Sequence, residues 1–86
     1  MIKKFRKKPV TIEAIQLTAE SFDECLSFVG EENTTDGTSV DECYIGLQTL
    51  EGEYGARKND YIIKGVQGEF YPCKPDIFSE TYEEVE

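Results

Sequence analysis

The residue types that usually carry chemistry are sparse in this chain. It contains no histidine, which removes the commonest general base and the commonest transition-metal ligand. Cys73 is a candidate nucleophile, because Lys74 and a predicted helical turn follow it, and both features lower a thiol pKa. The alternative is a structural thiol packed under the turn between Pro72 and Pro75, which is the commoner role of a free cysteine. We therefore expect a protein that is not an enzyme.

Metal and cofactor sites lack their usual spacing. Asp36, Asp41 and Glu42 could offer oxygen ligands to a hard cation, but their spacing differs from that of an EF-hand loop. The three cysteines, Cys25, Cys43 and Cys73, are far apart and fit neither a disulfide framework nor a zinc ribbon. No Walker or dinucleotide-binding motif is present. The sequence therefore predicts reduced thiols, no metal and no cofactor.

A cationic group near the C-terminal hairpin is the candidate ligand site. Its members are Arg57, Lys64, Tyr71 and Lys74. If Ile63 faces the core, Lys64 points to the opposite side of its strand, where it could contact a nucleotide phosphate or another anion. The alternative is that these cations are ordinary surface charges on a very acidic body.

Charge divides the chain into two parts. The net charge is −9, but the first eight residues carry five positive charges, on Lys3, Lys4, Arg6, Lys7 and Lys8. The remaining residues carry four cations against 18 acidic side chains, a balance of −14. Such a body repels nucleic acid and attracts basic protein surfaces, so the arm is the one nucleic-acid candidate. Its alternatives are a solvated strand edge or an ionic match to the tail residues Glu80, Glu83, Glu84 and Glu86.

Local patterns predict the elements that must position these residues. Residues 9–17 read as a strand whose apolar residues alternate along one face and then, near its end, fall on the other face. Residues 21–29 read as a helix that begins at a Ser21/Glu24 capping box and ends at Gly30. Residues 31–42 read as a polar loop ordered only at Val40. Strands are predicted over 43–50, 53–57, 61–64 and 69–71, with a turn at 58–60, a tight turn at 65–68, and Pro72 ending the last of these strands. One helical turn over 74–78 and an edge strand over 81–85 complete the chain.

Together these elements predict one domain over residues 1–86 of the α+β class. We expect a bent, partly closed antiparallel sheet of four to six strands with one short helix packed on it. An unpaired edge strand in so small a sheet favours a homodimer. No apolar run is long enough to span a membrane, and the N-terminus lacks the apolar region of a signal peptide, so we expect a cytoplasmic protein.

Two segments carry a family resemblance. The start Phe5-Arg6-Lys7-Lys8-Pro9-Val10-Thr11-Ile12-Glu13-Ala14-Ile15-Gln16, and the stretch from Asp60 to Phe78 followed by Thr81-Tyr82-Glu83, resemble the opening and closing signatures of a family of small phage and prophage proteins. They cover about half of the chain. Asn59 stands where that family usually has glycine, and Leu17 where it often has an aromatic residue. The resemblance implies a phage or prophage origin and a bacterial cytoplasm, but no activity.

Two functions follow as expectations. The first is a non-enzymatic binding protein that engages a host protein, for example a defence component, through its acidic surface. The alternative is a small-ligand binder that sequesters an anionic nucleotide through Lys64, Tyr71 and Lys74.

Overall fold

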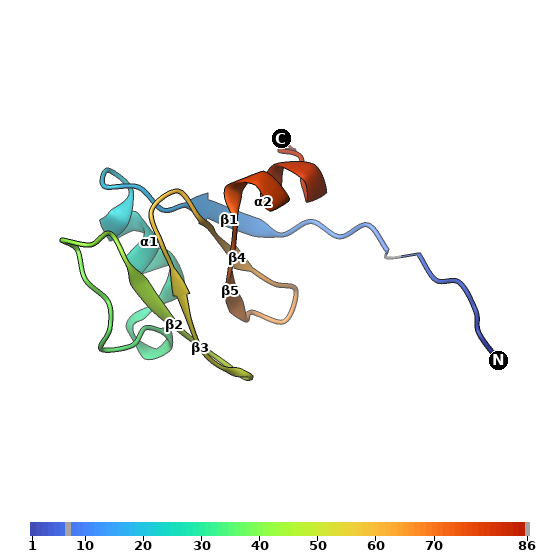
Figure 1. Cartoon of the computed structure of the whole chain (residues 1–86), viewed down its shortest axis with the longest axis horizontal. Helices are drawn as coiled ribbons and strands as arrows, with labels where there is room; N and C mark the ends of the chain where they lie inside the picture. Colours follow the sequence, from blue (N-terminus) through green and yellow to red (C-terminus); the bar gives the residue numbers. More distant parts are fainter. Residues whose placement is uncertain (7, 86) are drawn as a thin grey trace.

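The computed structural model describes residues 1–6 and 8–85 of the chain. Within them the order is β1 (Glu13–Gln16), α1 (Phe22–Val29), a 3-10 turn (Glu31–Asn33), β2 (Ile45–Thr49), β3 (Gly52–Ala56), β4 (Tyr61–Lys64), β5 (Phe70–Cys73) and α2 (Pro75–Thr81) (Figure 1). All strands pair antiparallel, so the predicted α+β class is confirmed. The five strands form two sheets, β1-β4-β5 and β2-β3, because the β2–β3 hairpin packs on β5 without hydrogen-bonding to it.

The main core lies between α1, the β2–β3 hairpin and one face of the three-stranded sheet. It consists of Leu17, Phe22, Cys25, Val29, Ile45, Leu47, Ala56, Ile62 and Phe70. The predicted apolar stripe of α1 supplies three of these residues, since positions three and four apart share one face of a helix. An eight-residue helix is too short to be stable alone, so this burial holds α1 in place.

The opposite face of the three-stranded sheet is covered by α2. Successive side chains of a strand point to opposite faces, so Tyr61 and Ile63 lie on the side away from Ile62. The Tyr61 ring stacks on Phe78 of α2 at 3.8 Å between centroids, and Phe78 contacts Tyr82 at 4.9 Å. Ile63 is 1% exposed on this face. The sheet is thus buried on both sides at β4.

The N-terminal segment is shorter as a strand than predicted. β1 covers only residues 13–16, because its partner β4 ends at Lys64 where the chain turns. The described residues of segment 1–12 form an extended arm that leaves the body (Figure 1), and none of them makes a hydrogen bond within the described chain. Beyond β1, Leu17 is fully buried and bonds the Asp60 carbonyl and the Asn59 N–H, at 2.8 and 2.7 Å.

Both ends of α1 can be compared with their predicted caps. The capping box does not form, because the Ser21 hydroxyl donates to the Gln16 carbonyl at 2.6 Å and accepts the Thr18 N–H at 2.9 Å. Ser21 therefore fixes the turn between β1 and α1. The Gly30 stop is confirmed: Gly30 has φ +90°, and its N–H donates to the Leu26 carbonyl at 2.9 Å.

The polar loop before β2 is ordered by its threonines and not by Val40. Val40 is 67% exposed, so the prediction that it orders the loop is wrong. The Thr35 N–H donates to the Gly46 carbonyl, and the Gly46 N–H donates to the Thr38 hydroxyl. A side chain at Gly46 would collide with Thr35, so this close approach requires glycine.

The C-terminal region departs from prediction in two places. Pro72 does not end its strand, since β5 runs through it to Cys73. The helical turn after Lys74 continues to Thr81, so the described part of segment 81–85 forms no strand and Tyr82 packs on Phe78 instead. The turn before β4 is confirmed: Asn59 has φ +76°, and the Asp60 carboxylate accepts the Arg57 N–H at 2.9 Å. No helix in the described chain is long and apolar enough to cross a bilayer.

Candidate functional site

The four predicted ligand-binding residues do not converge. Lys64 pairs across the sheet with Phe70, and Ile63 with Tyr71, so Lys64 and Tyr71 point to opposite faces. The Lys64 ammonium lies 6.0 Å from the centre of the Phe70 ring, on the face that carries the main core. The Arg57 guanidinium lies 5.2 Å from the Tyr44 ring, outside the hairpin that holds the other two.

Lys74 forms an ion pair with Asp60, which is the only buried charged residue among the described residues. Asp60 is 3% exposed, and both of its carboxylate oxygens lie 3.4 Å from the Lys74 ammonium. The same carboxylate accepts the Arg57 N–H, so it closes the turn into β4. A buried carboxylate with three hydrogen-bonding contacts holds a structural position. Lys74 therefore balances Asp60 more than it offers a free cation to a ligand.

Cys73 is not activated by its surroundings. Burial raises the pKa of the Cys73 thiol, and the carboxylates of Asp60 and Asp76 raise it further. The prediction that Lys74 lowers this pKa is wrong, because the Lys74 ammonium faces Asp60. Burial also raises the pKa of the Cys25 thiol, with a smaller opposing effect of its hydrogen bond to Ser21. Raised pKa values reduce the thiolate fraction that a nucleophile requires.

A groove lies between the tip of the β2–β3 hairpin and β5. It encloses about 370 Å³ and is lined by Thr49, Leu50, Glu51, Tyr54, Glu69, Phe70 and Tyr71. A second hollow of about 260 Å³, between α1 and the 3-10 turn, has one carboxylate and no aromatic ring. The first groove thus combines apolar walls with charge, as binding sites commonly do.

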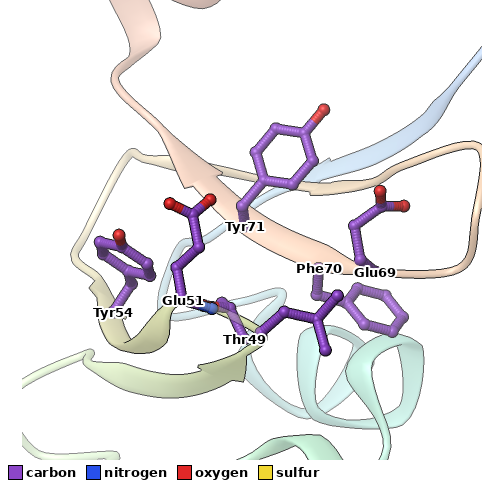
Figure 2. A pocket seen from close by; sticks show the side chains of 7 residues that line it. Thr49, Glu51, Tyr54, Glu69, Phe70 and Tyr71 are labelled. Carbon is purple, nitrogen blue, oxygen red and sulfur yellow. The ribbon is translucent and has the colours of Figure 1, made fainter.

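The two carboxylates of the groove differ in their exposure and in their hydrogen bonding. In Figure 2 the Glu51 side chain projects between Tyr54 and Tyr71. Glu51 is exposed, and its backbone N–H is held by the Thr49 hydroxyl at 3.1 Å, which fixes the turn beneath it. Glu69 is half-buried, and its carboxylate accepts the Gln67 N–H at 3.0 Å. Glu51 is therefore free to meet a ligand, while Glu69 adds negative potential from a fixed position.

Aromatic residues complete the walls of the groove. Tyr54 is 44% exposed and Leu50 is 98% exposed, so both present apolar surface to solvent at the hairpin tip. Burial, followed by the neighbouring Tyr82 hydroxyl, raises the pKa of Tyr71 to about 12, so Tyr71 stays neutral at physiological pH. A cation placed here meets a carboxylate at its head and aromatic rings at its sides, both of which attract it. An anion would be repelled.

Sequence reasoning found only one residue of this groove, Tyr71, and assigned it to an anion. Glu69 and Phe70 directly precede Tyr71 in the sequence. The other four members, Thr49, Leu50, Glu51 and Tyr54, come from the distant β2–β3 hairpin, and packing of β3 against β5 brings them to the groove. One signal was available: Leu50 is a large apolar residue directly before the Glu51-Gly52 turn, where polar residues are usual.

The chain matches no family model, no curated protein and no solved structure. The resemblance to phage and prophage proteins therefore stays a prediction. Within residues 1–6 and 8–85, no group of three His, Cys, Asp or Glu side chains is placed to hold a metal ion.

The basic arm has no ionic partner in the part of the chain that the structure describes. The only ion pair found there joins Lys74 and Asp60, so the described arm cations do not pair with the described acidic tail. Lys7 of the arm and Glu86 of the tail lie outside the described residues.

Proposed function

We propose that this chain is a small, acidic, non-enzymatic binding protein of phage or prophage origin that engages a host protein in the bacterial cytoplasm. Its contact site is the groove at the hairpin tip, and its ligand there is a basic segment of the partner. The observation that carries the proposal is the exposed Glu51 carboxylate in a groove walled by Tyr54 and Tyr71. The origin and the compartment are supported by the sequence resemblance alone.

The groove favours a particular kind of segment. A lysine or arginine would place its charge at Glu51 and its alkyl stem along the tyrosine rings, as such side chains do at apolar surfaces. An adjacent apolar residue of the partner would cover Leu50, which is otherwise fully exposed. The acidic body adds long-range attraction for a basic partner and accelerates its encounter.

A defined probe tests the groove directly. A fluorescein-labelled peptide that alternates Lys or Arg with Leu is titrated with the full chain, and binding is followed by fluorescence anisotropy. Glu51→Lys should weaken binding about tenfold, which corresponds to about 1.4 kcal/mol. Glu42→Lys is the matched control: it makes the same charge change on an exposed carboxylate outside the groove, and should change affinity about twofold.

The same two variants then serve as baits in a bacterial lysate. A host protein captured by the wild-type chain and by Glu42→Lys, but not by Glu51→Lys, supports the proposal. Equal loss with both variants would show that net charge alone drives capture, and no loss with either would place the contact elsewhere. Both outcomes contradict the proposed site.

A further inference from the structure

The two edges of the three-stranded sheet differ in what their backbones offer. In antiparallel pairs, residues alternate between bonding the neighbouring strand and pointing away from it. The Gly65 N–H donates to the Glu69 carbonyl at 2.7 Å, so Glu69, Tyr71 and Cys73 direct their backbone groups toward β4. Phe70 and Pro72 consequently point outward. Proline has no N–H, so the β5 edge lacks a donor at its centre.

The β1 edge has the opposite character. Leu17 bonds toward β4 through both its N–H and its carbonyl, so the odd-numbered residues of β1 face β4. Ala14 and Gln16 then point outward, and the same alternation continues through Ile12 and Val10 in the extended arm. Pro9 is odd-numbered, so its missing N–H does not fall on the free edge. This edge keeps every donor from residue 10 to residue 16.

We propose that a second copy of this chain pairs antiparallel with this edge, through residues 8–16 of each copy. Ile12 then lies opposite Ile12 of the second copy at the two-fold axis, with Val10 opposite Ala14 and Lys8 opposite Gln16. In this register Glu13 faces Thr11, whereas a shift by one pair would place the two Glu13 carboxylates directly opposite each other, which is destabilising. The product is one continuous six-stranded sheet.

The pairing also determines where the basic arm of each copy lies on the other copy. Running antiparallel along β1, the arm of one copy passes Gln16 and continues toward the turn before α1 of the other copy. Three exposed carboxylates lie there, Glu20, Asp23 and Glu24. The arm brings the cations Lys3, Lys4 and Arg6, all exposed and without an ion pair among the described residues. Exposed apolar side chains are covered as well, since Val10 is 52% and Phe5 is 91% exposed in the single chain.

Two proline variants of the full chain test this inference. Ile12→Pro removes an N–H that faces the second copy, and by symmetry removes it twice. Thr11→Pro, the matched control, removes an N–H that faces away from it. Neither residue belongs to β1 or bonds within the described chain, so both variants should keep the circular dichroism spectrum of the wild type.

Sedimentation velocity and native mass spectrometry supply the readout. We expect the wild-type chain and Thr11→Pro to form dimers of twice the 9.8 kDa chain mass, and Ile12→Pro to remain monomeric at the same concentrations. A monomeric wild-type chain at all concentrations would overturn the inference. So would a dimer that survives Ile12→Pro, or one that both prolines abolish alike. The pairing does not involve the groove, so its failure leaves the proposed function untouched.

Discussion

The two faces of the three-stranded sheet are buried by different means. One face joins α1 and the β2–β3 hairpin in a cluster of nine buried residues, six of them below 1% exposure. The other is covered by a single seven-residue helix, held by a short row of rings, Tyr61, Phe78 and Tyr82. Ile62 and Ile63 are thus almost equally buried, although Ile62 belongs to the large cluster and Ile63 lies on the face covered by one short helix. Four experiments address this difference.

The largest expected effect separates the neighbours Ile62 and Ile63. Ile62→Ala should lower the free energy of unfolding by about 4 kcal/mol, because the surrounding core cannot collapse into the cavity. Ile63→Ala should cost about 2 kcal/mol, since α2 can shift to fill the space. Urea denaturation at constant m-value measures both. Equal losses would show that the two faces are equally rigid.

Phe78→Ala should detach α2 from the sheet at a cost of about 2 kcal/mol, because it removes the ring between Tyr61 and Tyr82. Hydrogen exchange should accelerate over residues 75–82 and remain slow in α1. Ile77→Ala, on the exposed side of the same helix, is the control and should cost about 0.5 kcal/mol. Acceleration throughout the chain would mean that the α2 face belongs to the same cooperative unit as the main core.

The pH dependence of stability reports on Tyr71 at the margin of the α2 face. Its pKa is raised to about 12, against an unfolded value of about 10, so the folded chain holds this proton more tightly. Stability from this group is therefore complete below pH 10 and is lost as the pH rises toward 12. Thermal melting across this range should fall less steeply in Tyr71→Phe than in the wild type. Equal slopes in the two proteins would contradict this prediction.

The smallest expected effect concerns the ion pair that precedes α2. Lys74→Ala should cost about 0.5 kcal/mol, because the lysine side chain is 60% exposed and the pair is screened by solvent. Asp60→Ala should cost about 2 kcal/mol, because it leaves the Arg57 N–H without its acceptor. Chemical denaturation of the two variants gives the comparison. Equal costs would assign the stability to the ion pair instead of to the turn.

The sequence predicts most of the fold where the signals are local. Asn59 and Gly68 both adopt positive φ, in the turns before and after β4, and this strand was predicted to the residue. α1 was predicted within one residue from its apolar spacing and from Gly30. Pro72 was misread as a strand end, because its tolerance depends on whether β5 is an edge, and that is a property of the assembled sheet.

The candidate site was much less predictable. Lys64 and Tyr71 are close in sequence, but strand pairing separates them to opposite faces. Glu51 and Tyr54 are distant from Tyr71 in sequence, but hairpin packing brings them into one groove. Residue type gives no information on such juxtapositions, which depend on how two sheets meet.

The extended arm makes the charge of this protein adjustable by proteolysis. Its first eight residues carry five basic side chains that a protease specific for lysine and arginine recognises, and no hydrogen bond holds the described ones to the body. Their removal would change the net charge from −9 toward −14 and would leave all the strands, both helices and the groove intact. Cleavage would thus remove five of the nine cations and leave a strongly acidic chain, and the rate of that cleavage would itself report whether the arm is docked.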